Sequence, residues 1–481
     1  MASWRLPVIL RDRLAVWAGK KTLQFSRRFG HGGSSLPGLV ALRIQPAILN
    51  HLSADLRRGA VVITGTNGKT TTSRLLAAVL QEAEFALVHN RSGANLLPGL
   101  VSAFLERAAS RGNPVADVAL MEVDEATVPD AVRRLNPLGV VVTNFFRDQL
   151  DRYGELDTTV STVGRGLDLL GKRAFVALNA DDPLAASLGS SRTGRVVYYG
   201  LEDVSCGTPV MNQTREQRHC LRCGRPLVYD VFYYAHLGRY QCPAGDFERR
   251  VPDFAAKEVR LDGIVGSSFV LAAAGQAQAT VRVPVPGLYN VYNALAALTA
   301  AIELGVEPAR AAAALSRATA CFGRMEGIVI DGRRLILALV KNPAGYNQVI
   351  RTLLDGPVPQ GGRRFLMALN DKYADGTDIS WIWDVDFEIL ARPAAGVAGV
   401  VASGTRAEDL ALRLKYAGLP EGSVQTVSNL GRALDVSLEA VPEGATLFVT
   451  PTYTAMLELR DIISRRGLAP PFWETEAGSE A

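Results

Sequence analysis

The stretch VVITGTNGKTTTSRLLAAVL, residues 61–80, restricts the possible folds more than any other part of this chain. An apolar run leads into a glycine- and threonine-rich turn, and a helical pattern follows directly. Gly65 and Gly68 allow the turn to point its backbone N–H groups at an anion, which the N-terminus of the next helix also attracts. Lys69 would neutralise phosphate oxygens, and the Thr70 hydroxyl would bind Mg²⁺. The stretch predicts a strand, a phosphate-binding loop and a helix, although Ile63 stands where the longer motif has its first glycine.

Carboxylates that suit a metal ion follow a second apolar run. The segment ALMEVDEATVP, residues 119–129, brings Glu122, Asp124 and Glu125 to the end of a predicted strand. Ligands of open α/β sheets gather beyond the carboxyl ends of the strands, so this cluster is either a metal site or an acidic surface turn. A third segment, VVTNFFRDQLDRYGEL, also follows a strand and offers further polar side chains: Asn144, Asp148, Gln149 and Asp151.

Short β-rich runs alternate with helical segments from about residue 60, which is typical of a parallel sheet with helices on both faces. Residues 201–253 break this rhythm with cysteines, tyrosines and turn residues, and we interpret them as an insertion. We therefore expect an α/β chain with an N-terminal helical segment (1–54), a central domain that carries the phosphate loop (55–326), and a C-terminal Rossmann-like α/β domain (327–481).

Composition narrows the functional classes. A formal net charge of +4 over 481 residues is too small to indicate nucleic-acid binding. No stretch approaches the roughly 20 unbroken apolar residues that span a bilayer. Five cysteines without regular pairing fit a reducing compartment, so we expect a cytoplasmic location.

The first 28 residues, MASWRLPVILRDRLAVWAGKKTLQFSRR, are interrupted by Arg11, Asp12 and Arg13, which speaks against a signal peptide. The segment is either a basic amphipathic helix that lies on a membrane surface or a helix that packs on its own domain, and we favour the second interpretation.

Five motifs, spread in order over nearly the whole chain, resemble those of the Mur ligase superfamily: GTNGKTTT, VTNFFRDQLDRYGE, PGLYNVYNALAA, FGRMEG and PTYTAMLELR. Three stretches are similar to the MurT family within it: HGGSSLPGLVALRIQP, EVDEATVP and LNDKYADGTDISWIWDVDFE. The resemblance implies a Mur-ligase-type ATPase that uses ATP and Mg²⁺ to convert the D-glutamate α-carboxylate of the peptidoglycan stem peptide into an amide, giving D-isoglutamine.

The resemblance also implies a partner and a place in the cell. A GatD-type glutaminase subunit would form a heterodimer with this chain and supply ammonia. The substrate would be either lipid II or its soluble precursor. A lipid-linked substrate would bring the chain into peripheral contact with the inner face of the membrane.

Residue roles carried over from the motifs are equally specific. The ATP phosphates would contact the loop, Thr70 and Glu122 would bind Mg²⁺, Asn293 would face the adenine, and Arg324 would reach the nucleotide from near the hinge. The loop residues are Gly65, Thr66, Asn67, Gly68, Lys69, Thr70 and Thr71.

The C-terminal stretch that resembles MurT carries four candidate acids: Asp371, Asp375, Asp378 and Asp384. One of them is expected to complete the partner's catalytic centre, and we select Asp371, with Asp375 next; solvated loop acids are the alternative. Lys69, Glu122 and Asp371 are thus the predicted catalytic residues.

Two segments depart from the peptide-forming Mur ligases. Those enzymes have a metal-binding histidine where this chain has Gln149, and a D-x-A-H-N-P type segment where this chain reads Lys341-Asn342-Pro343. Both departures follow the MurT pattern and speak against addition of an amino acid. No histidine lies in a recognisable nucleophile motif, and Cys321 is interpreted as a core thiol, so the ammonia is expected to come from a separate subunit.

The insertion carries Cys220-x2-Cys223 and, after an aromatic segment, Cys242. Paired knuckles at this spacing usually form a four-thiolate Zn²⁺ ribbon, and MurT proteins carry such an insertion. Here Gly245 replaces the fourth cysteine, so the fourth ligand is expected to be Cys206, with His219 and His236 as weaker candidates. A degenerate ribbon that keeps its hairpin without metal is the alternative.

Two other functions remain open from the sequence. One is a Mur- or folylpolyglutamate-type ligase that adds an amino acid. The other is a non-catalytic nucleotide-binding protein whose cysteine insertion binds nucleic acid through its aromatic residues.

Overall fold

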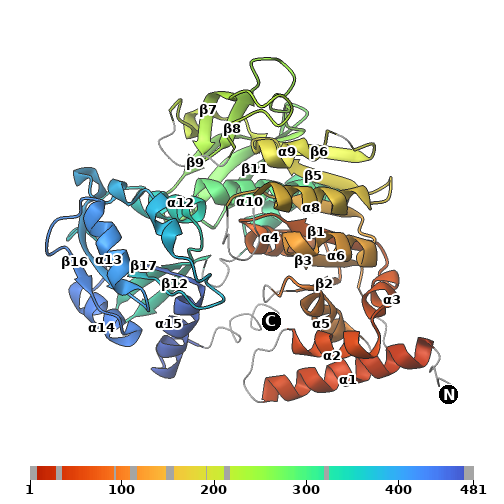
Figure 1. The fold of residues 1–481 in the computed structure, drawn as a ribbon, viewed down its shortest axis with the longest axis horizontal. Coiled ribbons are helices and arrows are strands. Elements are labelled where there is room, and N and C mark those ends of the chain that lie inside the picture. The colour runs from red at the N-terminus through yellow and green to blue at the C-terminus, as the bar shows by residue number, and fades with distance from the viewer. Residues whose placement is uncertain are drawn as a thin grey trace.

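The computed structural model describes residues 8–28, 35–90, 94–108, 116–147, 156–190, 192–210, 217–318 and 324–470. Within these residues, nine strands form the larger sheet in the order β11-β10-β9-β6-β5-β4-β1-β3-β2 (Figure 1). The strands are β1 (Gly59–Thr64), β2 (Leu87–His89), β3 (Val118–Glu122), β4 (Gly139–Val142), β5 (Phe175–Asn179), β6 (Arg195–Leu201), β9 (Phe254–Leu261), β10 (Ser267–Ala273) and β11 (Gln276–Val283).

The first six strands run parallel to their neighbours, as the alternating pattern predicted, and β9 runs parallel to β6. Strands β10 and β11 are added antiparallel at one edge, which makes the sheet mixed. After β1 the chain forms β2 and β3 on one side of that strand and then crosses to β4 on the other side, so the strand order reverses at β1. A crevice at the carboxyl end of β1 is where an open α/β sheet of this kind holds its ligand.

Alternate residues of β1 enter two different cores. Val61 and Ile63 pack with helices α4 and α10 on one face, whereas Ala60 and Val62 pack with α5, α6 and α8 on the other. The α/β prediction with helices on both faces is therefore confirmed. The helices of this part are α4 (Lys69–Glu82), α5 (Leu97–Arg107), α6 (Val128–Leu135), α8 (Leu156–Asp168), α9 (Pro183–Ser187), α10 (Leu288–Glu303) and α11 (Pro308–Leu315), with the short 3₁₀ turn η1 (Glu125–Thr127).

A second, six-stranded sheet has the order β12-β13-β17-β14-β15-β16 among the described residues, and only its β12–β13 pair is antiparallel. It consists of β12 (Arg324–Ile330), β13 (Arg333–Ala338), β14 (Arg363–Ala368), β15 (Val397–Ser403), β16 (Val424–Thr426) and β17 (Thr446–Pro451). Its helices are α12 (Pro343–Leu354), α13 (Ala407–Tyr416), α14 (Leu430–Ala440) and α15 (Tyr453–Arg465), with 3₁₀ turns η3 (Ser380–Asp384), η4 (Phe387–Ile389) and η5 (Pro393–Ala395).

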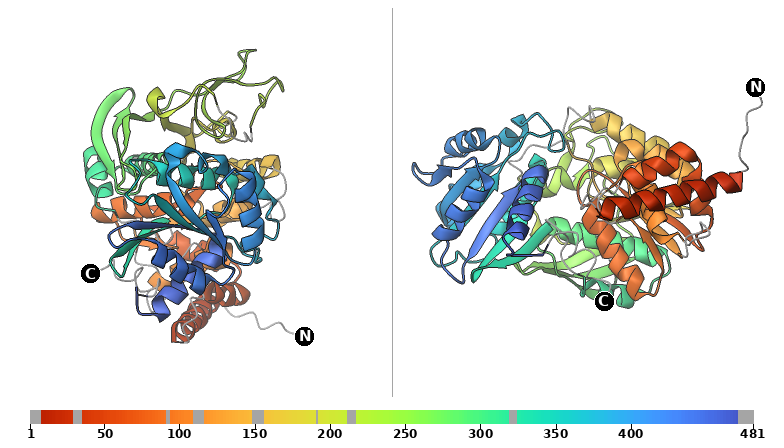
Figure 2. Two further views of the ribbon diagram at one scale, coloured as in Figure 1. Left: turned by 90° about the vertical axis from the view of Figure 1, so that its left-hand side faces the viewer. Right: turned by 90° about the horizontal axis from the view of Figure 1, so that it is seen from below.

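Two smaller parts complete the described chain. The inserted segment forms the 3₁₀ turn η2 (Val204–Cys206) and a two-stranded sheet of β7 (Val228–Tyr234) and β8 (Leu237–Gln241). At the N-terminus, α1 (Val8–Arg28), α2 (Leu36–Ile44) and α3 (Ile48–Ala54) pack on the central part (Figures 1 and 2). In the described part of the chain, no helix combines the length and apolar composition needed to cross a bilayer.

Candidate active site

The phosphate loop lies between β1 and α4, and two of its glycines are required by close contacts. Gly65 has φ +120°, and a Cβ added there would lie 2.4 Å from Thr143 Oγ1. Gly68 has φ +88°, and an added Cβ would lie 2.0 Å from Asn293 Oδ1. Both positions therefore exclude a side chain through sterics as well as backbone conformation.

The residues after β4 clamp this loop. The backbone N–H of Asn67 donates to Asn144 Oδ1 at 2.9 Å, and Asn144 Nδ2 donates back to the carbonyl of Asn67 at 3.1 Å. Thr143 Oγ1 donates to the same carbonyl at 2.8 Å. The Thr-Asn pair thus fixes the loop conformation from a neighbouring strand. The sequence motif indicated that Asn144 lies near the site, but it did not predict that Asn144 holds the loop.

Lys69 is buried at the first position of α4. Its Nζ lies 3.1 Å from Glu125 Oε2 and also donates to the carbonyls of Gly65 at 2.5 Å and Thr66 at 3.4 Å. Both charged side chains are only 9% exposed. A buried ammonium on the loop, oriented by a carboxylate from η1, is arranged to meet anionic phosphate. The sequence grouped Glu125 with the metal acids, whereas the structure pairs it with Lys69.

Thr70 and Glu122 lie together, as the predicted Mg²⁺ ligands should. Thr70 Oγ1 donates to Glu122 Oε1 at 3.2 Å, and Glu122 is 4% exposed at the end of β3. Asn90 brackets the backbone of Glu122, since its amide donates to the Glu122 carbonyl at 2.8 Å and accepts from its N–H at 2.9 Å. Asp124, by contrast, caps η1 by accepting from the N–H of Ala126 at 3.1 Å. Hydroxyl and carboxylate oxygens so placed fit a hard cation.

The second sheet contributes directly to the loop through the Lys341-Asn342 segment before α12. The side-chain amides of Asn342 and Asn67 exchange hydrogen bonds at 3.0 and 3.3 Å. Lys341 Nζ donates to the carbonyl of Thr66 at 3.1 Å. The segment that replaces the D-x-A-H-N-P type sequence therefore touches the phosphate loop across the two α/β parts.

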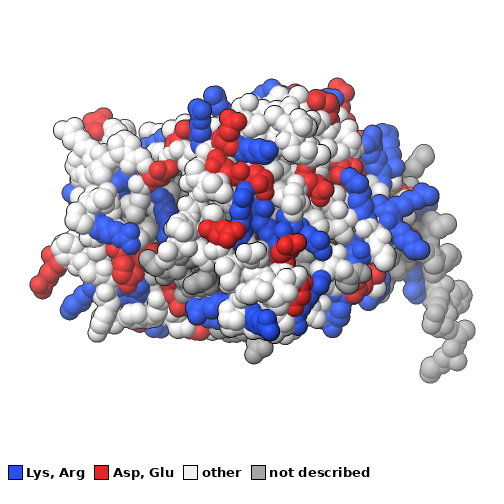
Figure 3. Space-filling view, turned by 90° about the horizontal axis from the view of Figure 1, so that it is seen from above, with Lys and Arg blue, Asp and Glu red and all other residues white. Residues whose placement is uncertain are grey.

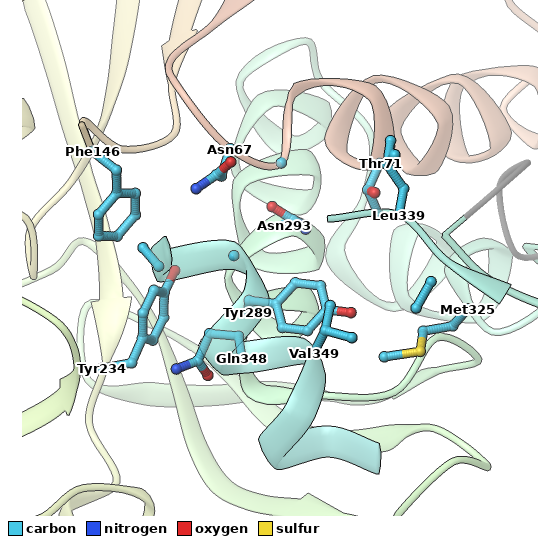
Figure 4. Close-up of a pocket in the computed structure, with 14 residues that line it drawn as sticks. Asn67, Thr71, Phe146, Tyr234, Tyr289, Asn293, Met325, Leu339, Gln348 and Val349 are labelled. Atoms are coloured by element: carbon cyan, nitrogen blue, oxygen red, sulfur yellow. The ribbon is translucent and has the colours of Figure 1, made fainter. Parts of the chain in front are cut away.

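A pocket opens beside the loop, between the two sheets (Figure 4). Its lining combines aromatic and aliphatic side chains with three amides, a composition typical of sites for small organic ligands. Its lining residues are Asn67, Gly68, Thr71, Phe146, Tyr234, Tyr289, Asn293, Met325, Ala338, Leu339, Ala344, Gly345, Gln348 and Val349.

Asn67, Gly68, Thr71 and Asn293 are predicted ligand residues that the structure brings to this pocket. Thr66 is buried and donates from Oγ1 to the carbonyl of Phe146 at 3.2 Å, so it serves the loop's shape. Other predicted residues lie where side chains are not described. Only the backbone of Arg324 is described, at the first position of β12, whereas Asp148, Gln149, Asp151 and Cys321 lie outside the described residues.

Tyr234, which the sequence did not single out, comes to the pocket from the inserted hairpin. Its ring lies 5.9 Å from that of Phe146 at an interplanar angle of 24° (Figure 4). Burial raises the pKa of Tyr234 well above its usual value, so the phenol stays neutral. The hairpin is held in place at His236, whose Nε2 lies 3.3 Å from Asp182, and Asp182 in turn accepts from the N–H of Phe145 at 2.7 Å.

The candidate acids of the C-terminal part have different environments. Asp371 follows β14, is partly exposed, accepts from Thr405 Oγ1 at 2.9 Å and lies 3.4 Å from Arg406 Nη1. Asp375 is buried and accepts from both the N–H and the hydroxyl of Thr454 at the start of α15.

The two remaining acids are exposed. Asp378 accepts from the N–H of Ser380 at 2.8 Å, a bond that lowers the pKa of the carboxyl, and Asp384 ends η3. Asp371 is therefore held by neighbouring side chains and still accessible to solvent, whereas the carboxylate of Asp375 is occupied by hydrogen bonds within its own domain.

Three of the predicted zinc ligands come together in the insertion. The Sγ atoms of Cys220, Cys223 and Cys242 and a carboxylate oxygen of Asp246 all lie within 4.8 Å of one another. Cys223 Sγ lies 3.4 Å from Cys242 Sγ, close to the roughly 3.8 Å that two thiolates on one tetrahedral zinc would have. The N–H groups of Arg222 and Ala244 donate to the sulfurs of Cys220 and Cys242, both at 3.4 Å.

The prediction that Cys206 is the fourth ligand does not agree with this geometry. Cys206 is not part of the described group: it packs on the core of the central sheet, where burial raises the pKa of its thiol to about 11. His219 and His236 are also absent from the group, and His236 is bonded to Asp182. Gly245 makes a left-handed turn with φ +73°, and this turn brings the next residue, Asp246, to the sulfurs. The sequence motif places the fourth ligand at position 245, where this chain has glycine, and so it did not predict the carboxylate of the next residue.

Two family models match this chain: the Mur ligase middle domain over residues 63–224 and the MurT ligase C-terminal domain over residues 339–456. The structure resembles that of a pseudomurein peptide ligase type C from Methanothermus fervidus, with a TM-score of 0.65 at 24% identity over 85% of this chain and 79% of that one. It also resembles MurF from Acinetobacter baumannii, with a TM-score of 0.63 at 19% identity over 88% and 80%. At these identities the likeness shows the fold.

Full-length relatives in sequence are closer. The chain is 32% identical over 456 residues to the lipid II isoglutaminyl synthase (glutamine-hydrolyzing) subunit MurT of Staphylococcus aureus (strain COL), covering 95% of this chain and 98% of that protein. It is 33% identical over 459 residues to the subunit of the same name from Streptococcus pneumoniae (strain ATCC BAA-255 / R6), covering 95% and 98%. With both domain matches in order and near-complete coverage, this chain belongs to the MurT family of the Mur ligase superfamily.

Proposed function

We propose that this chain is the synthetase subunit that amidates the D-glutamate α-carboxylate of the lipid II stem peptide to D-isoglutamine, with ATP as energy source. The observation that carries the proposal is the alignment with two MurT subunits over 95% of the chain. The phosphate loop, the Thr70–Glu122 pair and the adjacent pocket support ATP use. The Lys341-Asn342 segment at the loop supports an arrangement that differs from the amino-acid-adding ligases.

The reaction needs ATP because a carboxylate is a poor electrophile. Transfer of the γ-phosphoryl group to a carboxylate oxygen gives an acyl phosphate and ADP; ammonia then attacks the carbonyl carbon and displaces phosphate. Lys69 and the loop N–H groups hold the phosphates, and Thr70 and Glu122 would hold the Mg²⁺ that neutralises their charge. Asn293, Tyr289 and Tyr234 would enclose the adenosine. Ammonia must arrive unprotonated, which favours a site shielded from water.

The ammonia is proposed to come from a GatD-type glutaminase that forms a heterodimer with this chain. The relatives named above are subunits of a glutamine-hydrolysing synthase. Asp371 is the acid that best suits the subunit interface, because Thr405 and Arg406 fix it while it remains partly exposed. A cytoplasmic site of action at the inner face of the membrane follows from the lipid-linked substrate.

We also propose that Cys220, Cys223, Cys242 and Asp246 bind Zn²⁺, which would lock the two knuckles of the insertion. Asp246→Ala is expected to lower the zinc content from about one equivalent to a small fraction, because three thiolates leave a structural site incomplete. Elemental analysis of purified protein measures this. Asp246→Cys should retain the metal, and Cys206→Ser is the matched control that should not change it. A zinc loss in Cys206→Ser with full occupancy in Asp246→Ala would reverse the assignment.

Tyr234→Ala is expected to weaken ATP binding about tenfold, because an aromatic wall beside a base contributes about 1–3 kcal/mol. Calorimetric titration with a non-hydrolysable ATP analogue measures the Kd without turnover. Tyr234→Phe keeps the wall and should bind within about twofold of the unmodified chain. An unchanged Kd in Tyr234→Ala would remove the residue from the adenosine site.

Mass spectrometry of the product tests the proposed reaction. Lipid II and its soluble precursor are each incubated with the chain, ATP and Mg²⁺, with ammonium, with glutamine plus the co-expressed glutaminase, or with a panel of amino acids. Replacement of one hydroxyl by an amino group with ammonium alone supports the synthetase role. An amino-acid adduct would instead support the Mur- or folylpolyglutamate-type ligase.

The nucleic-acid alternative has less support. On the face seen from above, Lys and Arg lie among Asp and Glu and form no continuous basic stripe (Figure 3). Salt-dependent binding of nucleic acid, with ATP bound but not turned over and no amidation in any arm of the mass-spectrometric assay, would favour it.

A further inference from the structure

The N-terminal helix α1 packs on its own domain through small residues. Ala15 and Val16 are buried in the same core as α5. A Cβ added at Gly19 would lie 2.5 Å from Leu105 Cδ1, so α1 approaches α5 very closely there. Lys20 also donates to the carbonyl of Ala108. The interpretation that the helix packs on its own domain is therefore correct for this inner face.

The outer face of α1 carries its largest apolar side chains. Leu10 is 47% exposed, Leu14 42% and Trp17 60%. The spacing of four and three residues places them on one stripe of the helix. A surface helix normally buries its large apolar residues, whereas α1 exposes these three. The next helix, α2, which packs against α1, adds the exposed Leu36 and Leu39.

The outer face of α1 also carries two cationic side chains. Arg13 and Lys21 are exposed, and they share the helix face of Leu14 and Trp17. The one acid of α1, Asp12, is turned inward, where it accepts from Gln45 Nε2 at 2.8 Å and lies 2.9 Å from His51 Nδ1. The outer face thus combines apolar and cationic groups and presents no carboxylate of the helix itself.

We infer that the outer face of α1 is a docking surface for an anionic phospholipid bilayer. Aliphatic and Trp side chains enter the boundary between headgroups and acyl chains, while Arg and Lys meet lipid phosphates. A second copy of the chain is disfavoured as the occupant, because a two-fold contact would set Arg13 and Lys21 of one copy against those of the other. Seen from below, α1 is the element nearest the viewer, so a flat surface reaches it first (Figure 2).

This inference deepens the proposed function, on which its biological purpose rests: docking through α1 would hold the synthetase at the surface where a lipid-linked substrate lies. The physical claim, binding to an anionic bilayer, stands independently of the reaction. It is therefore tested first by binding and then by turnover.

Flotation with vesicles measures the binding. The full chain is expected to bind vesicles of phosphatidylglycerol and phosphatidylcholine, to bind pure phosphatidylcholine at least about tenfold more weakly, and to be released by salt. Leu14→Ser/Trp17→Ser should weaken binding at least about tenfold, since both side chains would lose apolar burial in the bilayer. Arg13→Gln/Lys21→Gln should lose the preference for anionic lipid.

Two controls keep this test decisive. Leu412→Ser removes a leucine of similar exposure from α13 and should bind vesicles like the unmodified chain. Affinity for an ATP analogue should be the same in all variants, which shows that they are folded. Equal flotation of Leu14→Ser/Trp17→Ser and the unmodified chain would overturn the inference. So would a change from dimer to monomer in that variant with no vesicle binding by any form.

Turnover separates the two proposals. Amidation of lipid II in anionic vesicles should fall at least about fivefold in Leu14→Ser/Trp17→Ser, whereas amidation of the soluble precursor should be unchanged. Vesicle binding without amidation of any substrate would refute the proposed function and leave the docking surface standing. Amidation by a chain that never binds vesicles would do the reverse.

Discussion

Replacement of Lys69 by methionine is expected to lower the rate of ATP-dependent amidation by about a thousandfold or more, because a fixed ammonium on the phosphates contributes several kcal/mol to a phosphoryl transfer. The same change should destabilise the fold by about 3–5 kcal/mol, since Glu125 would remain buried without its cationic partner. Product formation by mass spectrometry and thermal unfolding measure the two effects.

A second substitution separates these two consequences. Lys69→Met/Glu125→Gln removes both buried charges, so its thermal stability should return most of the way to that of the unmodified chain while its activity stays low. Glu82→Gln, at the exposed end of the same helix, is the matched control and should leave amidation unchanged. Recovery of activity together with stability would mean that Lys69 only supports the loop.

Replacement of Asp371 by asparagine is expected to lower the rate of amidation with glutamine but not the rate with ammonium. With the co-expressed glutaminase and glutamine, amidation should fall about 10²- to 10⁴-fold, as when the acid that orients a catalytic base is neutralised. With ammonium, amidation should stay within about twofold, because Asp371 follows β14 of the second sheet and does not line the pocket beside the phosphate loop. Rates with the two nitrogen sources, measured side by side, give the ratio.

Asp375→Asn and Asp378→Asn test whether another acid, rather than Asp371, contacts the partner. Asp375 caps α15 through Thr454, so its replacement should cost about 1 kcal/mol of stability and lower both rates in parallel. Exposed Asp378 should tolerate the change. A selective loss of glutamine use in Asp375→Asn, with Asp371→Asn unaffected, would move the partner contact to the buried acid.

Local sequence was enough for the phosphate loop. Gly65, Gly68 and Lys69 lie within a few residues of one another, and their conformations follow from backbone freedom and helix geometry that act at short range. The strand that carries Glu122 was predictable for the same reason, and parallel strands must bring their carboxyl ends to one edge.

Contacts between distant segments were not predictable in this way. The pairing of Lys69 with Glu125, the amide pair of Asn67 and Asn342, and the arrival of Tyr234 at the pocket each depend on how separate elements pack. The sequence showed an aromatic run in the insertion. Its periodicity did not indicate which ring would line the pocket and which would pack in the core of the hairpin.

The proposed zinc site combines one feature that the sequence spacing predicts and one that it does not. The Cys220-x2-Cys223 spacing predicted one knuckle, because two ligands so close in sequence must approach through a tight turn. The proposed fourth ligand depends on the direction of the chain after the second turn. The left-handed Gly245 places the Asp246 carboxylate beside the sulfurs, while Cys206 packs on the central core.

By itself, therefore, the sequence determined the α/β fold, the phosphate loop and the family, because these rest on short-range backbone preferences, hydrophobic periodicity and motif order. The tertiary structure decided the partner of Lys69, the carboxylate beside the three cysteine sulfurs, the walls of the pocket and the exposed apolar face of α1. Each of these is a relation between side chains on different elements, and packing of the whole chain alone sets which of them meet and which remain at the surface.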